Sequence, residues 1–401
     1  MKIGGGSGVQ ALADKPMNFD APEEHELLRQ SVRRFFAEEL PEVKIREMDQ
    51  ARKVPKALWK RFAELGWMGL SIPEEYGGSG ADLTTGVVFC EELARQFPSL
   101  GTNYVIFSMA ARALREHGTQ KQKDELLPRM ARGEFMFAFG ITEPSGGTDV
   151  LSLSTRAQLD GQEWVINGQK VYTTFADDAD AILVVCRTDP PSEGKRARGL
   201  SLILAPRNQP GFAIRRLHLM GMRAACTCET FIENVRAPAD GLLGDRGSGW
   251  YHLLATLDEE RILSAALYVG IMDGVLAQAT QYAGDRTAYG RAIGAFQAVQ
   301  HPIAEIATDL QLSRTMVTKA AWLLANGREC SKEAAMAKVF ASEAAVRSTD
   351  RGLRVLAGYG LVEESPMERL FRDARLGPFS PISNEMARNF IGQRLGLPRS
   401  Y

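Results

Sequence analysis

The spacing of apolar residues predicts helices over the first third of this 401-residue chain. Between Glu23 and Glu39, apolar side chains recur every three or four residues, as they do on one face of an α-helix. The same pattern returns over Val54–Leu65, Leu83–Gln96 and Lys121–Met130. We therefore expect residues 20 to 135 to fold as helices.

The pattern changes near residue 136, where short β-rich runs alternate with Gly, Asn, Asp and Pro. Trp164–Ile166 leads into Asn167-Gly168, a dipeptide typical of a hairpin turn, and Lys170–Thr174 follows as the second strand. Further strands are expected at Ala181–Cys186, Leu200–Ala205 and Glu229–Ile232. We interpret this part of the chain as a small β-barrel or sandwich.

Long apolar-periodic and Ala-rich segments return over residues 251–284, 297–326 and 331–357, and their length is typical of a helical bundle. The predicted fold class is α+β, with an N-terminal helical domain, a middle β domain and a C-terminal four-helix bundle. The expected divisions are a flexible tail at 1–16, then domains at 17–135, 136–246 and 247–401.

Composition narrows the class of function. Hydrophobic residues make up 45% of the chain, which supports a sizeable core, and the net charge is −1, without the basic excess of a nucleic-acid-binding protein. No window approaches 18 continuous apolar residues, so no membrane span is expected. The N-terminus lacks a basic region followed by an apolar core, so we expect no secretory signal and a cytoplasmic location.

The five cysteines do not form a disulfide framework in the sequence, because their number is odd and their spacing is irregular. Cys226-Thr227-Cys228 has one intervening residue, which is not a zinc-knuckle spacing. None of the five histidines has a partner three or four residues away. We therefore expect reduced structural thiols and no metal centre.

Six blocks between residues 139 and 373 resemble, in order, those of the acyl-CoA dehydrogenase family. The first, Phe139–Asp149, reads FGITEPSGGTD, and the last runs from Gly358-Tyr359-Gly360-Leu361 to Glu364, Arg369 and Asp373. Between them lie Ile166–Lys170, Gly221–Arg223, Leu257–Arg261, and Arg286 with Tyr289-Gly290. The resemblance spans about residues 20 to 398. It implies FAD as the cofactor and an acyl-CoA thioester as the substrate.

The residue types of the first blocks suit an isoalloxazine ring, which is flat, apolar and edged with hydrogen-bonding atoms. Gly146 and Gly147 permit close backbone approach, and Tyr172 and Thr174 lie two apart on a strand and so face one side. By resemblance, Tyr172 packs against the flavin. The resemblance places these residues around the ring: Phe139, Ile141, Thr142, Gly147, Thr148, Tyr172, Thr174 and Ser383.

The remote half of FAD carries a diphosphate, for which the always-charged, forked guanidinium of Arg286 is a suitable ligand. By resemblance, Tyr289, Gln297 and Gly358 lie near the same end, and the loop containing Gly358 comes from a neighbouring subunit. This implies a homo-oligomer, a homotetramer built as a dimer of dimers. Arg354 stands where the family usually has Gln, and it adds positive charge near the diphosphate.

Two further departures from the family pattern are Ala357, where Gly is usual, and Ala288, where a hydroxyl or amide residue is usual. They leave a weakened cofactor site open as an alternative. On that alternative, the chain is a cofactor-poor structural subunit working beside an active partner.

The reaction requires a carboxylate to remove the acidic hydrogen next to the thioester carbonyl while hydride leaves for flavin N5. Many family members place this Glu in the last loop, where this chain has Pro381. Isovaleryl- and long-chain-type enzymes place it at the position of Glu260. Glu260 is also the only charge on an otherwise apolar helical stripe. Two alternatives remain: a buried ion pair of Glu260 with Arg261 or another arginine, and Glu385 as the base.

By resemblance, Thr148, Asp258 and Arg261 contact the acyl-CoA. The acyl tail pocket is predicted to be lined by Asn103, Tyr104, Phe107 and Ser108. The predicted activity is α,β-dehydrogenation to the 2-enoyl-CoA, with an electron-transfer flavoprotein as electron acceptor. The alternative direction is reduction of an enoyl-CoA.

Overall fold

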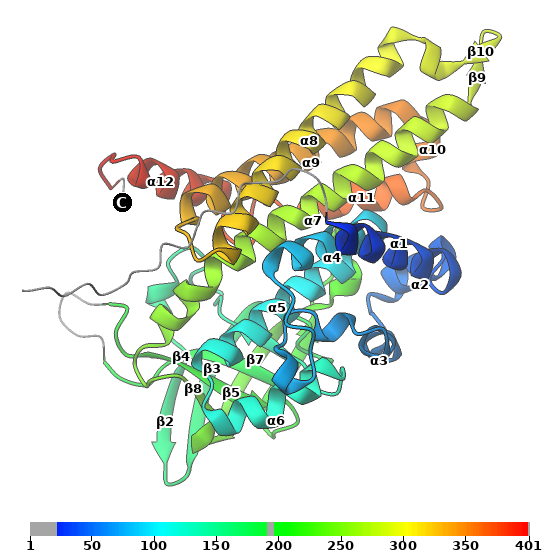
Figure 1. The fold of residues 1–401 in the computed structure, drawn as a ribbon. Coiled ribbons are helices and arrows are strands. Elements are labelled where there is room, and N and C mark those ends of the chain that lie inside the picture. The colour runs from blue at the N-terminus through cyan, green and yellow to red at the C-terminus, as the bar shows by residue number, and fades with distance from the viewer. Residues whose placement is uncertain (1–21, 191–195, 400–401) are drawn as a thin grey trace, which may run out of the picture.

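The computed structural model describes residues 22–190 and 196–399. It has a helical layer, an eight-stranded sheet and a bundle of long helices, as Figure 1 shows. This confirms the predicted α+β fold class. The predicted tail at 1–16 lies outside the described residues.

Six helices form the N-terminal layer: α1 (Glu23–Glu38), α2 (Glu42–Ala51), α3 (Lys56–Glu64), α4 (Leu83–Gln96), α5 (Pro98–His117) and α6 (Gln120–Ala131). Local signals fix several of their starts. The Asp82 carboxylate accepts a hydrogen bond from the Thr85 amide at the start of α4, and Thr119 with Gln122 forms a capping box on α6. Helix α4 has the predicted bounds, whereas α2 and α5 were not predicted.

The middle sheet has the strand order β6-β7-β3-β2-β4-β5-β8, with β1 paired to β4. Its strands are β1 (Phe137–Gly140), β2 (Arg156–Asp160), β3 (Glu163–Thr174), β4 (Ala181–Arg187), β5 (Leu200–Pro206), β6 (Phe212–Arg216), β7 (Thr227–Pro238) and β8 (Leu242–Leu243). Most neighbours are antiparallel, and β1 and β2 run parallel to β4.

The hairpin predicted at Asn167-Gly168 is wrong. Strand β3 continues through both residues and pairs with β7 on either side, with a register shift between Ile166 and Gly168. A β-bulge therefore accommodates the glycine, whose φ is 156°. The chain turns earlier instead, at Gly161, where φ is 62° and β2 pairs back onto β3.

The C-terminal bundle is built on α7 (Gly249–Asp285), α8 (Gln297–Ala325) and α9 (Ser331–Leu356), close to the predicted segments. The short elements are β9 (Thr287–Ala288), β10 (Arg291–Ala292), α10 (Gly358–Leu361), α11 (Pro366–Ala374) and α12 (Asn384–Arg394). Figure 1 shows β9 and β10 at the tip of the bundle, at the far end from the sheet.

Glycines on α7 allow α4 to lie against it. A Cβ at Gly270 would stand 2.2 Å from the Glu91 carbonyl oxygen, and one at Gly274 would stand 2.5 Å from that of Arg95. Either substitution would force the two helices apart, because real Cβ atoms do not approach this closely. The two glycines lie four residues apart and so on one face of α7.

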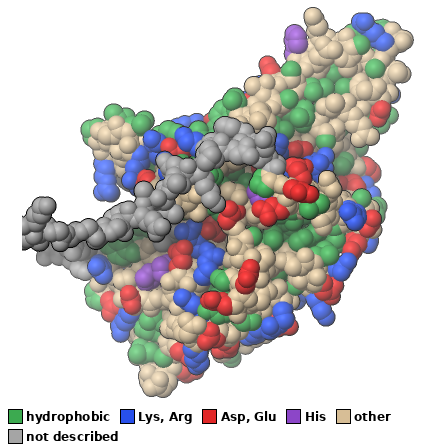
Figure 2. All heavy atoms as spheres, in the orientation of Figure 1, with side chains coloured by type: hydrophobic (Ala, Val, Ile, Leu, Met, Phe, Trp, Pro, Cys, Tyr) green, Lys and Arg blue, Asp and Glu red, His purple; other side chains and the backbone are tan. Residues whose placement is uncertain are grey.

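Helix α7 is the one helix among the described residues that is long and apolar enough to cross a membrane. However, 72% of its most apolar window is buried inside the protein, as in the central helix of a bundle. In the view of Figure 2, acidic and basic side chains are interspersed over the surface, in keeping with a net charge of −1.

Candidate functional site

A buried ion pair holds the loop that follows β1. The Lys170 ammonium donates to the Ile141 carbonyl at 3.0 Å and to the Glu143 carboxylate at 2.9 Å. Glu143 also accepts from the backbone amides of Ser154 and Thr155, at 2.7 and 2.9 Å. Although burial opposes it, this set of donors lowers the pKa of Glu143 to about 2. Burial lowers the pKa of Lys170, and Glu143 opposes that shift. The loop is therefore fixed on the sheet by a buried ion pair.

This loop and β3 together present a shelf of exposed and half-buried residues, which we call the flavin shelf: Thr142, Gly147, Thr148, Tyr172 and Thr174. Thr142 is half-buried and Thr148 is exposed. Tyr172 is 63% exposed and sits at φ 59° beside a bulge in β3. Thr173 between them is buried, so Tyr172 and Thr174 both face outward, as predicted.

The flavin shelf suits an isoalloxazine ring on three grounds. It offers an exposed aromatic face at Tyr172 and the hydroxyl of half-buried Thr174, which hydrogen-bonds to the buried Thr227 hydroxyl at 3.4 Å. At Gly147, an added Cβ would find only the Thr142 methyl within 4 Å, so the surface there is open. Of the other predicted ring contacts, Ile141 is half-buried, whereas Phe139 is 6% exposed and packs against Phe137, so its ring belongs to the core.

A second group of predicted cofactor residues lies at the tip of the bundle. Arg286, Tyr289, Gln297 and Gly358 are all exposed there, and Tyr289 is 96% exposed. The Arg286 guanidinium carbon lies 5.9 Å from the centre of the Tyr359 ring, which places α10 beside the end of α7. Arg354 is exposed and pairs with Asp350 at 3.2 Å.

Helix α7 separates this tip from the flavin shelf within one chain. Glu260 and Arg286 are 26 positions apart on it, which corresponds to about 39 Å at 1.5 Å per residue. This is longer than one extended FAD. The structure therefore brings together the residues of each group, but it does not bring the two groups together in a single chain (Figure 1).

Glu260 is a half-buried carboxyl on the inner stripe of α7. Leu253, Leu267 and Ile271 on the same stripe are buried. Desolvation by this apolar surrounding raises the pKa of Glu260 to about 7, with Arg261 opposing the shift. Within residues 22–190 and 196–399, Glu260 has neither a hydrogen bond nor an ion pair, so the ion-pair alternative is not observed.

The neighbours of Glu260 define the direction in which it points. Successive residues on a helix are 100° apart. Asp258 contacts the start of α9 through Ser331, Glu259 contacts α5 through Ser108 and Arg112, and Arg261 lies over the Phe390 ring of α12 at 5.1 Å. Glu260 therefore points into the sector between α5 and α12, opposite α9.

The adjacent carboxylates are engaged in structure. Glu259 accepts from the Ser108 hydroxyl at 2.8 Å and from Arg112 at 2.8 Å. Asp258 pairs with Arg261 at 3.0 Å, so these two predicted substrate contacts are already in contact with each other. Of the three acidic residues, Glu260 alone lacks an ion pair among the described residues.

The loop with Pro381 is fixed by a lysine that the sequence analysis missed. The buried Lys338 ammonium donates to the Ile382 carbonyl at 2.5 Å and to Asn384 Oδ1 at 2.7 Å. Burial lowers the pKa of Lys338 to about 8, and Glu385 opposes the shift. Lys338 lies among buried alanines on α9, so the lone-charge criterion that singled out Glu260 would also have found it.

Two other predicted residues flank this loop. Ser383 begins α12, where its hydroxyl accepts from the Met386 amide at 3.3 Å. Glu385 is exposed in the first turn of α12, so it lacks the apolar surroundings that Glu260 has.

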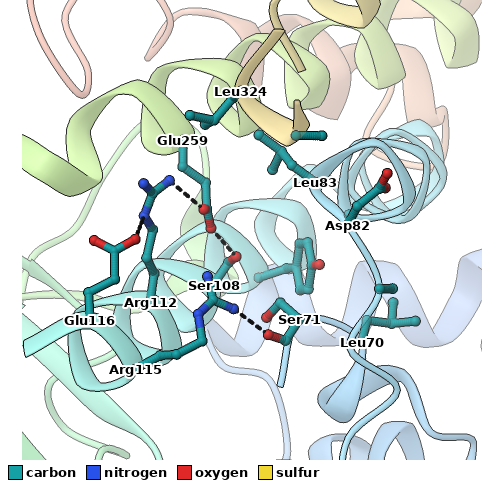
Figure 3. A pocket seen from close by; sticks show the side chains of 14 residues that line it. Leu70, Ser71, Asp82, Leu83, Ser108, Arg112, Arg115, Glu116, Glu259 and Leu324 are labelled. Carbon is teal, nitrogen blue, oxygen red and sulfur yellow. Dashed lines mark hydrogen bonds and ion pairs between the residues drawn. The ribbon is translucent and has the colours of Figure 1, made fainter. Parts of the chain in front are cut away.

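A cavity of about 260 Å³ lies on the α5 side of α7. Figure 3 shows Arg112 between Glu259 and Glu116, and Arg115 reaching the Ser71 carbonyl. Of the four residues predicted to line an acyl tail pocket, Tyr104 and Ser108 line this cavity. Asn103 and Phe107 are buried elsewhere along α5.

Comparison with known proteins gives the family. Three family profiles match consecutive parts of the chain: acyl-CoA dehydrogenase N-terminal domain over residues 22–134, middle domain over 138–235 and C-terminal domain over 247–396. A probable acyl-CoA dehydrogenase, YngJ, from Bacillus subtilis is 38% identical and covers 94% of this chain and 100% of its own length. An acryloyl-CoA reductase (NADH) from Anaerotignum propionicum is 34% identical and covers 95% of this chain and 96% of its own length.

A solved structure described as an electron transferring flavoprotein of Acidaminococcus fermentans contains a chain with a TM-score of 0.90 to this protein. That chain is 32% identical, and the match covers 94% of this chain and 99% of that chain. Together with the three profiles and the flavin shelf, these matches establish FAD as the cofactor and the CH–CH group of an acyl-CoA as the point of oxidation. The chain belongs to the acyl-CoA dehydrogenase family.

Proposed function

We propose that Glu260 is the base that removes the proton from the carbon next to the thioester carbonyl. The observation that supports this role is a carboxyl with a pKa of about 7, free of any cation among the described residues, on an apolar stripe. A base is most effective when its pKa lies near the working pH, because it is then both deprotonated and able to hold the proton. FAD, when bound, accepts the hydride from the neighbouring carbon, and the C=C bond forms.

The surrounding residues maintain the environment in which Glu260 has a raised pKa and no ion pair. Arg112 neutralises Glu259, which would otherwise place a second negative charge beside Glu260, and Ser108 donates a hydrogen bond to the same carboxylate. Lys338 fixes the loop in which Pro381 stands. Proline has no N–H to offer a thioester carbonyl. The next amides, those of Ile382 and Ser383, make no hydrogen bond within the described residues, so we propose them as donors to that carbonyl.

We propose further that the working enzyme is a homo-oligomer, a dimer of dimers. The separation of about 39 Å between Glu260 and Arg286 along α7 supports this, since a second copy is needed to bring an Arg286 to each flavin. An electron-transfer flavoprotein is the proposed electron acceptor, in line with the description of the Acidaminococcus match. The proposed location is cytoplasmic.

The test is a visible spectrum of the purified protein with FAD, followed by anaerobic titration with a panel of acyl-CoAs. Yellow protein that an acyl-CoA bleaches is the expected result. Colourless protein despite added FAD would instead identify a cofactor-poor structural subunit. Re-oxidation of the reduced protein by an enoyl-CoA measures the reverse direction, which the similarity to an acryloyl-CoA reductase makes worth testing.

A further inference from the structure

Asp177, Cys226 and Cys228 meet at one end of the sheet, where β3 ends and β7 begins. The carboxylate oxygen and the two sulfur atoms all lie within 4.8 Å of one another. Both cysteines are buried, and the Asp177 side chain keeps 15% of its surface exposed. The cluster thus combines a closed interior side with one edge open to solvent.

The backbone brings the two sulfurs together. In an extended strand, residues two apart are separated by about 6.7 Å. Here Cys226 ends a 3-10 turn in the left-handed region, at φ 57°, before β7 begins. Its carbonyl accepts from the Phe175 amide at 2.9 Å, and Cys228 lies opposite Thr173 in the β3–β7 ladder. This left-handed turn at Cys226 shortens the distance between the two cysteine side chains.

Asp177 comes from the turn after β3 and is oriented from both sides. One oxygen, Oδ1, accepts from the Cys226 thiol at 2.9 Å. The other, Oδ2, is held by the Arg216 guanidinium at the end of β6. Arg216 thereby turns Oδ1 toward the sulfurs, as the outer partner of a metal-binding carboxylate does.

We propose that these three residues bind one zinc ion, through Asp177 Oδ1 and the two cysteine sulfurs, with water as the fourth ligand. Binding releases the two thiol protons, so two RSH and Zn²⁺ give Zn(SR)₂ and two H⁺. The ion's two positive charges and Arg216 balance two thiolates and one carboxylate. Zinc–sulfur bonds of about 2.3 Å in a tetrahedron require sulfurs about 3.8 Å apart. This separation is compatible with ligand atoms that all lie within 4.8 Å of one another.

The site holds together the ends of three strands beside the flavin shelf. Cys228 pairs with Arg216 of β6 on one side and with Thr173 of β3 on the other. The next pair is Thr174, a residue of the flavin shelf, with Thr227, and their hydroxyls hydrogen-bond to each other. A bound ion would therefore fix the edge of the sheet from which Thr174 projects, without taking part in electron transfer.

The test measures zinc in the FAD-loaded, full-length protein after dialysis against zinc and then against buffer. Elemental analysis and native mass spectrometry are expected to show one zinc per chain, as an adduct less two protons. Cys228→Ser and Asp177→Asn are expected to lose it. Cys330→Ser, which changes another buried cysteine, is expected to retain it.

Two results would overturn the proposal. One is retention of zinc by Cys228→Ser, or its absence from the unmodified protein. The other is a chain lighter by two hydrogens with three titratable thiols in denaturant, which would mean that Cys226 and Cys228 form a disulfide. Cobalt replacement provides a check that does not depend on the variants folding, because tetrahedral thiolate–cobalt absorbs in the red, where oxidised flavin is transparent. None of these readouts depends on dehydrogenase activity.

Discussion

Replacing Glu260 with Gln is expected to abolish catalysis and to stabilise the fold. Gln keeps the size of the side chain but cannot accept a proton at neutral pH. A positioned general base contributes about 10²–10⁴ in rate, so reduction of the flavin by an acyl-CoA should fall by that factor. FAD binding should be unchanged, because Glu260 is not among the residues of the flavin shelf or the bundle tip.

The gain in stability follows from the pKa. The Glu260 carboxyl has a pKa of about 7 in the folded chain, against 4.5 in the unfolded chain. The folded state therefore holds the proton more tightly, and stability falls as pH rises from about 4.5 to 7. Above pH 7, the full pKa difference lowers the free energy of unfolding by about 3 kcal/mol. Partial solvation of the half-buried carboxyl reduces this to about 2 kcal/mol.

The assay combines stopped-flow anaerobic bleaching of the flavin with denaturant unfolding at pH 5 and pH 8. Glu260→Gln should show a rate loss at both pH values and a gain in stability mainly at pH 8. In the unchanged protein, the rate of reduction should rise with pH and level off above about 7. A variant that still reduces its flavin at near the original rate would refute Glu260 as the base.

Glu259→Gln is the matched control, one position away on the same helix. It weakens the pair with Arg112, whose distance is 2.8 Å. We expect a loss of about 1–3 kcal/mol in stability, because a partly buried arginine loses a charged partner. The rate of flavin reduction should stay within a few-fold. The two neighbouring substitutions thus have opposite effects on stability and unequal effects on rate.

Three further outcomes are expected. Ala357→Gly should raise the free energy of unfolding by about 1 kcal/mol in a denaturant titration, because Ala357 adopts φ 51° and ψ −132°, which only glycine adopts freely. Lys170→Met should cost about 3–5 kcal/mol and release FAD on gel filtration, since it leaves the Glu143 carboxylate buried without its cation, and adding Glu143→Gln should restore part of the loss. Co-refolding Glu260→Gln chains with Arg286→Ala chains should restore activity that neither has alone, if one flavin takes these residues from two chains; no recovery would contradict the shared site.

Periodicity predicted α8 and α9 because each alternates buried and exposed positions along its length. Helix α7 was predicted from its long apolar segment, although residues 261–272 are buried on every side. Periodicity missed α5, in which most residues from Pro98 to Leu114 are buried, so that no polar stripe marks the helix. It misassigned Asn167-Gly168, because the same dipeptide suits a tight turn and a bulge, and only the pairing of β3 with β7 along its whole length decides between them.

In the candidate site, too, local sequence patterns reveal some residues and not others. Glu260 could be proposed as the base from the sequence, since a lone charge on an apolar stripe is a local property, and that role stays a prediction. The partners of Glu259 could not, because Arg112 lies 147 positions away and no local pattern joins them. The same holds for Asp177, which is 49 positions from Cys226. Contacts of this kind follow from how the elements pack.

The continuity of α7 from the reaction centre to the bundle tip limits how this protein can vary. One residue inserted between Glu260 and Arg286 would lengthen the helix by about 1.5 Å and rotate its far end by about 100°. Arg286, the proposed diphosphate ligand, would then point in another direction while the Glu260 carboxyl stayed in place. We expect relatives to conserve the number of residues in this interval more strictly than their identity, and to tolerate insertions in the β9–β10 turn beyond it.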